Sequence, residues 1–156
     1  MKVLIVEDRN DKYDDLIKTI DPLLPDEATV RRAATVVAAK KEIKGEQWSL
    51  LLLDMSIDIK SEVAKVAHGG HASLGGLDIV EYMYLFELDI PTIIITGFDY
   101  FEAAKSDAAM SELVGLDDIA HTAKLKIGCS FLGIVRYQEA SWKENLVGLI
   151  CDWRDR

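Results

Sequence analysis

Four short runs of apolar residues recur along the chain, separated by longer segments of mixed polarity. The runs are continuous rather than alternating, which is typical of strands buried on both faces of a parallel sheet. A more polar segment, Ala28–Ala34, predicts a weaker strand whose Arg31 and Arg32 face its wetter edge. The apolar runs are Val3–Val6, Leu50–Leu53, Thr92–Ile95 and Phe131–Val135.

Between these runs, apolar residues repeat at helical spacing. Pro22 ends the first such segment, because proline cannot continue a helix. Thr35 is suited to cap the second and Gly45 to end it. Ser141 and Glu144 have the spacing of a capping box that opens the last. The predicted helices are Asp11–Ile20, Val36–Ile43, Leu77–Phe86, Leu116–Lys126 and a final one carrying Leu146, Leu149, Ile150 and Trp153.

Strict alternation of strands and helices predicts an α/β fold. Each helical crossover returns the chain to the same end of the sheet, so neighbouring strands run parallel. Right-handed crossovers then place helices on both faces. The sequence therefore predicts a flavodoxin-like, doubly wound (βα)5 sandwich with a five-stranded parallel sheet, formed by residues 1–156 as a single domain without a separate output domain.

Two connections, residues 55–74 and 97–115, are longer than the roughly 12–15 residues usual for an unstructured loop. We expect a short helix in each, around Ser61–Ala67 and Tyr100–Met110. Both connections follow the C-terminal end of a strand, where open parallel sheets bind their ligands. The additional chain is therefore expected to surround the functional site.

The net charge argues against two classes of function. The 156 residues carry a formal charge of −9, which argues against a nucleic-acid-binding surface and against adsorption to anionic lipid. No apolar stretch reaches the length of a membrane span, and Met1 opens no signal peptide. Cys129 and Cys151 match no metal or redox spacing and are interpreted as reduced thiols in the core of a cytoplasmic protein.

Carboxylates follow two of the predicted buried strands. Glu7 and Asp8 end the first, and Asp54 ends the third. The ends of parallel strands meet at one sheet edge, so three like charges converge there, which is costly unless a cation joins them. Mg²⁺ suits such a site, because it takes one or two carboxylates and keeps several waters. The cluster predicts a Mg²⁺ site at which a carboxylate attacks a phosphoryl group.

Two further strand ends add polar groups to this edge. Thr96 ends the fourth strand and offers a hydroxyl to a phosphoryl oxygen, while Gly97 allows close approach of the backbone. Arg136 ends the fifth strand and adds a cation opposite the metal.

The segments VLIVEDRND, LLLLDM, GGLDIVEYM and IPTIIITG, in this order, resemble the receiver domain of two-component response regulators. The resemblance covers essentially the whole chain. It implies that Asp54 accepts a phosphoryl group from a histidine kinase, a phosphotransfer protein or a small phosphodonor. The implied Mg²⁺ ligands are Asp8, Asp54, Glu7 through water and the carbonyl of Ser56. Thr96 is the implied switch hydroxyl, whose movement signals to a downstream protein partner.

The same resemblance implies a signalling module rather than an enzyme, with at most self-phosphorylation and self-dephosphorylation. Three positions depart from the family pattern. Arg136 stands where the family has lysine, Gly133 stands near the expected switch aromatic, and no proline follows Asp54 closely. Phe131 and Tyr137 are aromatic substitutes at other spacings. These departures keep open an alternative, a degenerate receiver that binds protein partners independently of phosphorylation.

A Mg²⁺-dependent enzyme ranks third. A haloacid-dehalogenase-type phosphohydrolase needs a second aspartate where Ser56 stands, and a topoisomerase–primase-like metal domain needs a closer pair than Asp54 and Asp58. His68 and His71 are interpreted as solvent-exposed loop residues rather than metal ligands. The four glycines at 69, 70, 75 and 76 are interpreted as a source of flexibility, because they do not match a nucleotide-binding turn.

Overall fold

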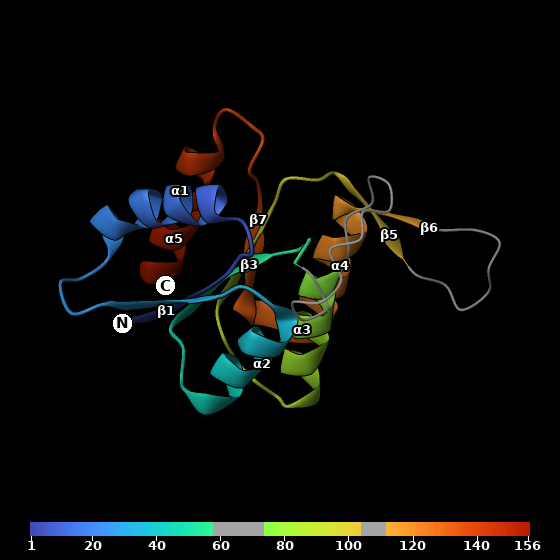
Figure 1. The fold of residues 1–156 in the computed structure, drawn as a ribbon, viewed down its shortest axis with the longest axis horizontal. Helices are drawn as coiled ribbons and strands as arrows, with labels where there is room; N and C mark the ends of the chain where they lie inside the picture. The colour runs from blue at the N-terminus through green and yellow to red at the C-terminus, as the bar shows by residue number, and fades with distance from the viewer. Residues whose placement is uncertain (58–73, 104–111) are drawn as a thin grey trace.

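The computed structural model describes residues 1–57, 74–103 and 112–156. Five parallel strands form a sheet in the order β2-β1-β3-β4-β7, with helices on both faces (Figure 1). This confirms the flavodoxin-like α/β fold. The strands are β1 (Lys2–Val6), β2 (Thr29–Ala33), β3 (Leu50–Asp54), β4 (Thr92–Thr96) and β7 (Phe131–Arg136).

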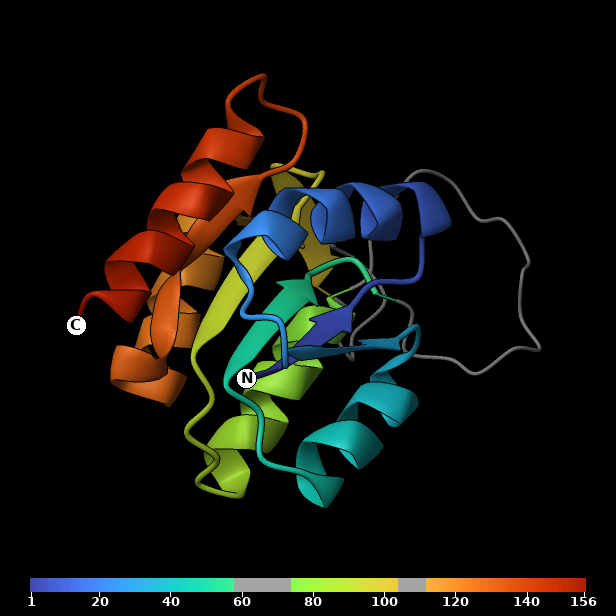
Figure 2. The ribbon, with the colours of Figure 1, turned by 90° about the vertical axis from the view of Figure 1, so that its left-hand side faces the viewer.

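The helices divide into two layers. Helices α1 and α5 cover one face of the sheet, and α2, α3 and α4 cover the other, as Figures 1 and 2 show. Their bounds are α1 (Asn10–Ile20), α2 (Val36–Gly45), α3 (Gly75–Leu85), α4 (Leu116–Ile127) and α5 (Trp142–Arg154), with single 3-10 turns at Asp21–Leu23 and Gly128–Ser130.

The central strand β3 is buried on both faces. Leu50 and Leu52 pack beneath α1 and α5, whereas Leu51 and Leu53 pack beneath α2, α3 and α4. All four leucines are at most 1% exposed, and burying one such side chain contributes about 1.5–3 kcal/mol. Two-sided burial therefore explains the continuous apolar run and holds the C-terminal end of β3 in a fixed position.

The connection after β4 contains a β-hairpin where a helix was expected. Residues Tyr100–Ala103 form strand β5, which pairs in antiparallel fashion with β6 (Glu112–Gly115). The helix prediction over Tyr100–Met110 is therefore wrong for its first turn, and residues 104–111 lie outside the described part. Phe101 anchors the hairpin, since it is 1% exposed and joins the core beneath α4. The expected helix at 61–67 also lies outside the described residues.

Two local predictions, the capping bond of Ser141 and the burial of the cysteines, are wrong. Ser141 precedes α5 but makes no side-chain capping bond, because its backbone (φ −91°, ψ 14°) already turns and is not extended. Cys129 and Cys151 are free and exposed rather than buried in the core. Cys129 lies in the turn after α4, and Cys151 lies on the solvent face of α5, next to the buried Ile150.

Candidate functional site

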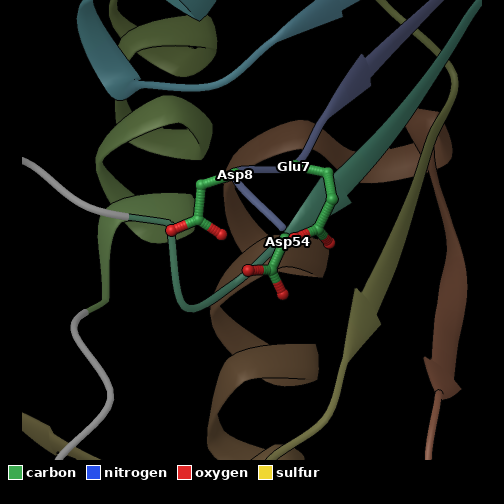
Figure 3. A group of neighbouring side chains, drawn as sticks. All are labelled: Glu7, Asp8 and Asp54. Atoms are coloured by element: carbon green, nitrogen blue, oxygen red, sulfur yellow. The ribbon is translucent and has the colours of Figure 1, made fainter. Parts of the chain in front are cut away.

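Three carboxylates meet at the C-terminal edge of the sheet. Strands β1 and β3 are parallel neighbours in which Val6 pairs with Leu53, so the next residues, Glu7 and Asp54, lie side by side. One carboxylate oxygen from each of Glu7, Asp8 and Asp54 lies within 4.8 Å of the others (Figure 3). The structure thus brings together the three acidic residues that the sequence predicted at one site.

The three carboxylates differ in exposure. Glu7 is 1% exposed and Asp54 is 3% exposed, whereas Asp8 faces solvent. Burial, reinforced by the neighbouring charge of Asp54, raises the pKa of Glu7 to about 7. The ammonium of Lys12 opposes this shift without cancelling it. In the metal-free site, Glu7 therefore keeps its proton up to about neutral pH.

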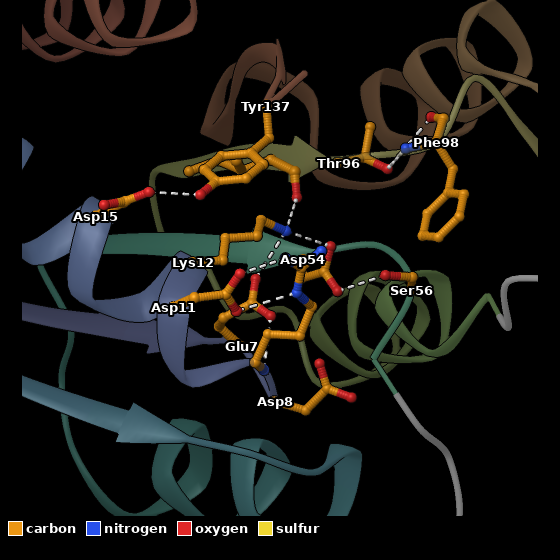
Figure 4. Close-up of polar contacts among 12 residues, drawn as sticks. Glu7, Asp8, Asp11, Lys12, Asp15, Asp54, Ser56, Thr96, Phe98 and Tyr137 are labelled. Atoms are coloured by element: carbon orange, nitrogen blue, oxygen red, sulfur yellow. Dashed lines mark hydrogen bonds and ion pairs between the residues drawn. The ribbon is translucent and has the colours of Figure 1, made fainter.

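Lys12 is the site residue that the sequence reasoning missed. This lysine projects from α1 and is 2% exposed. Its Nζ lies 2.7 Å from Oδ1 of Asp54 and 2.7 Å from Oε2 of Glu7, and donates to the carbonyl of Ile95 at 3.0 Å (Figure 4). A signal was present, because Lys12 occupies the first of three positions, followed by Leu16 and Ile20, on the buried stripe of the helix.

An aromatic side chain covers Lys12. The Tyr137 ring lies 5.6 Å from Lys12 Nζ, within reach of a cation–π contact, and packs at 4.9 Å against Trp142. The Tyr137 hydroxyl donates to Oδ2 of Asp15 at 2.6 Å. Burial and this hydrogen bond raise the pKa of Tyr137 to about 12, which keeps the phenol neutral. Tyr137 therefore helps to hold the ammonium inside the site.

The donor set fits a divalent cation. Oε2 of Glu7 faces Lys12 but lacks a hydrogen bond of acceptable geometry, and is the sole such buried side-chain atom across residues 1–57, 74–103 and 112–156. Three carboxylates with one unsatisfied buried oxygen are the oxygen-rich environment that Mg²⁺ prefers. Asp8, Asp54 and Glu7 are the residues that would hold the ion.

Arg32 fixes the backbone that carries two of these acids. From β2, its guanidinium donates to the carbonyls of Glu7 and Asp8, each at 2.8 Å, and to Oδ1 of Asn10 at 2.7 Å. The same group stacks 4.7 Å from the ring centroid of Tyr13. Arg32 therefore sets the path of the chain between β1 and α1, on which the carboxylate positions depend.

We expect Arg32→Gln to weaken Mg²⁺ binding about tenfold, because groups that orient metal ligands typically contribute this much. Calorimetric titration with Mg²⁺ measures the change. Arg31→Gln is the matched control, since Arg31 pairs with Glu42 and Glu46 away from the acidic loop. Equal affinities of the two variants would contradict the role given to Arg32.

Two glycines pack the start of α3 against the segment after Asp54. A Cβ at Gly76 would lie 2.8 Å from the carbonyl oxygen of Asp54, and one at Gly75 would lie 2.0 Å from that of Ile57. The expected role of these glycines in flexibility is therefore wrong, because both are buried in a helix and allow close backbone contact. Asp58, His68 and His71, and the glycines at 69 and 70, lie outside the described residues.

Ser56 and Thr96 both make local hydrogen bonds. Ser56 Oγ donates to Oδ2 of Asp54 at 2.6 Å. The buried Thr96 hydroxyl accepts from the N–H of Phe98 at 3.1 Å and is 3.3 Å from its carbonyl oxygen (Figure 4). Ser56 thus contacts Asp54 directly, and Thr96 occupies the predicted end of β4.

Arg136 lies at the end of β7 and is paired with Asp99 and Glu139 rather than with the three carboxylates of the cluster. Its side chain is 51% exposed and lies 3.6 Å from Asp99 and 3.4 Å from Glu139. Arg136 and Thr96 line one depression of about 110 Å³. The structure therefore does not place Arg136 beside Asp54, and the cation that contacts Asp54 comes from α1.

No protein-family model and no curated protein match the sequence. Solved structures do match it. A two-component response regulator from Clostridium difficile aligns with TM-score 0.64 and 12% identity over 100% of this chain and 97% of its own. A response regulator receiver protein from Pseudoalteromonas atlantica aligns with TM-score 0.63 and 14% identity, over 97% and 95%.

A CheY-like receiver domain from Methanospirillum hungatei aligns with TM-score 0.62 and 16% identity, over 99% of this chain and 93% of its own. At such low identity the likeness shows the fold. The chain has the receiver fold of response regulators, with its acidic cluster at the C-terminal sheet edge. In the described part of the chain, no helix is both long and apolar enough to span a bilayer.

Proposed function

We propose that this protein is a cytoplasmic receiver that accepts a phosphoryl group on Asp54 and signals to a protein partner. The observation that carries the proposal is the position of Asp54, which ends the buried central strand beside Glu7 and Asp8. A rigid strand end presents the carboxylate at the edge of the sheet, where a donor can approach. The donor class is a histidine kinase, a phosphotransfer protein or a small acyl phosphate.

The chemistry is nucleophilic attack by a carboxylate. An oxygen of Asp54 forms a bond to phosphorus, and the bond from phosphorus to the donor group breaks, with its electron pair leaving on the donor. Asp8, Asp54, Glu7 and the Ser56 carbonyl would hold Mg²⁺, which would supply positive charge near the phosphoryl oxygens. Strand β3 positions Asp54, and Arg32 keeps the acidic loop in place.

The switch role of Thr96 belongs to the same proposal. Its hydroxyl accepts a hydrogen bond from the N–H of Phe98 at 3.1 Å and donates to the carbonyl oxygen of Phe98 at 3.3 Å, which is long for a bond donated by a hydroxyl. A phosphoryl group on Asp54 offers this hydroxyl a charged acceptor, and charge-assisted bonds are the stronger kind. Rotation of Thr96 would release Phe98 and carry the signal toward the hairpin.

Mass spectrometry after incubation with acetyl phosphate and Mg²⁺ tests the proposal. We expect one added phosphoryl group per chain in the wild type and none in Asp54→Asn. Asp155→Asn, at the exposed end of α5, is the control and should be modified like the wild type. An unmodified wild type, with acetyl phosphate and with a cognate kinase, would contradict the proposal.

A specific observation favours the degenerate receiver as the second candidate. Gly133 has φ of 152°, and a Cβ there would lie 3.1 Å from two methyl carbons of Leu149, so a side chain at this position would be strained. This chain therefore cannot transmit a signal through an aromatic side chain at position 133. If Asp54→Asn leaves partner binding unchanged, the phosphorylation-independent function is the correct one.

A further inference from the structure

The buried ammonium of Lys12 contacts two carboxylates of the site, Glu7 and Asp54, and the carbonyl of Ile95. It lies on the core-facing stripe of α1, where burial of a charge is costly unless that charge is fully paired. We propose that Lys12 is the catalytic cation of the site, and that it binds the oxygens of a phosphoryl group on Asp54. This inference rests on the proposed function and assigns to α1 a group that the sequence suggested at the end of β7.

The three protons of the ammonium are unequally used. One is donated to Oδ1 of Asp54 at 2.7 Å and one to the carbonyl of Ile95 at 3.0 Å. The third faces Oε2 of Glu7 at 2.7 Å, yet this oxygen receives no aligned hydrogen bond. The bonds to Asp54 and Ile95 hold Lys12 at the nucleophile, and its third proton remains to be redirected toward a phosphoryl oxygen.

The charge of Lys12 acts where negative charge accumulates. An anionic donor that approaches Glu7, Asp8 and Asp54 is repelled by three carboxylates, and a buried cation in contact with the attacking residue offsets that repulsion. As the bond to phosphorus forms, a preorganised cation stabilises the equatorial oxygens without rearranging solvent. Lys12 acts through its charge, and the step transfers no proton to or from it.

Arg136 is poorly placed for this task. Its guanidinium is half exposed and lies near Asp99 and Glu139, so it would have to leave two carboxylates to reach the site. Lys12 already touches the reacting carboxylate and is held there by the ring of Tyr137. Removal of Lys12 is therefore expected to slow phosphorylation, and removal of Arg136 is not.

Lys12 also competes with the metal. The ammonium occupies oxygens of Glu7 and Asp54 that a divalent ion needs, and its charge repels the ion. Removing Lys12 should tighten Mg²⁺ binding while it slows phosphorylation. A purely structural lysine predicts no such opposition, because loss of structure weakens both.

The test compares Lys12→Gln with Arg136→Gln. We expect Lys12→Gln to slow acetyl phosphate-dependent modification of Asp54 about 100-fold or more, and to bind Mg²⁺ at least about threefold more tightly by calorimetry. Arg136→Gln should change neither by more than about twofold. Modification of Lys12→Gln at the wild-type rate, or loss of Mg²⁺ binding in a folded Lys12→Gln, would overturn the assignment.

A second measurement needs no variant and applies if Lys12→Gln fails to fold. The Lys12 ammonium resonance of the wild type, followed by ¹⁵N NMR, should shift when Mg²⁺ and beryllofluoride are added together. Beryllofluoride binding without such a shift would overturn the role of Lys12 alone. Absence of both phosphorylation and beryllofluoride binding in the wild type would instead overturn the proposed function, and this assignment with it.

Discussion

Glu7→Gln should remove most of the pH dependence of stability that the metal-free protein shows between pH 4.5 and 8. In the folded state, burial and the nearby Asp54 raise the pKa of Glu7 to about 7. Between pH 4.5, the ordinary pKa of a glutamate, and about pH 7, the folded protein keeps a proton that the unfolded chain has lost. Stability is therefore fully present below pH 4.5 and falls as the pH rises through 7.

The size of this effect follows from linkage. A shift from 4.5 to about 7 corresponds to about 3.5 kcal/mol at most, because one pKa unit is worth about 1.4 kcal/mol. The glutamine amide cannot accept a hydrogen bond from both Lys12 and the N–H of Arg9, which contact different oxygens of Glu7. We therefore expect a net gain of about 1–2 kcal/mol at pH 8, and a net loss of about 1–2 kcal/mol at pH 4, where Glu7 of the wild type keeps its proton.

Urea unfolding with a chelator, repeated from pH 4 to pH 9, measures the difference. Glu27→Gln is the control, since Glu27 is an exposed carboxylate outside the site. Added Mg²⁺ should stabilise the wild type more than Glu7→Gln, because the variant has lost one ligand. An unchanged pH profile of stability in Glu7→Gln would show that the pKa of Glu7 is not raised in the folded protein.

The sheet and its acidic edge could be predicted because each depends on the sequence locally. Continuous apolar runs define strands buried on both faces, and parallel strands must end at the same edge. Asp54 could therefore be placed beside Glu7 without knowledge of any contact across the sheet. The position of Thr96 at the end of β4 followed in the same way.

The cation could not be assigned by this reasoning, because it depends on side-chain reach across the fold. Lys12 comes from a helix rather than a strand end, and its ammonium meets Asp54, 42 positions later in the chain. Its place in the stripe with Leu16 and Ile20 was the available signal, but a lysine at the polar start of a helix is usually solvated. Arg136 was favoured because it ends a strand, and its charge is drawn instead to Asp99 and Glu139.

The hairpin and the glycines show a second limit. Phe101 sits in a short segment whose strand character depends on pairing with Glu112–Gly115 after an intervening stretch of chain. Gly75 and Gly76 suggest a loop by composition. Close contact with the backbone of Ile57 and Asp54, however, makes glycine the only residue type small enough at these two positions of α3. In both cases the deciding interaction is nonlocal.

Gly76→Ala should destabilise the protein by about 2–3 kcal/mol, whereas the same change at Gly148 should stabilise it by up to about 1 kcal/mol. Both glycines lie in helices, where alanine is normally the better residue. At Gly148 nothing lies within 4 Å of the added Cβ. At Gly76 the Cβ would lie 2.8 Å from the Asp54 oxygen and the Met55 Cα, both of them backbone atoms.

The clash at Gly76 is expected to have a functional consequence, because one of the backbone atoms that it displaces belongs to Asp54, the proposed nucleophile, and the other to the next residue, Met55. The carbonyl of Met55 also accepts a hydrogen bond from the backbone N–H of Gly76 at 3.1 Å, so the start of α3 and the end of β3 are expected to move together. We expect Gly76→Ala to lower the rate of Asp54 phosphorylation even in conditions where the variant is fully folded, and Gly148→Ala to leave it unchanged. Thermal unfolding and phosphorylation rates measured on the same samples separate the two effects. Equal stability of Gly76→Ala and Gly148→Ala would contradict the close packing of α3, and a stability loss without a rate change would show that Asp54 keeps its position independently of that helix.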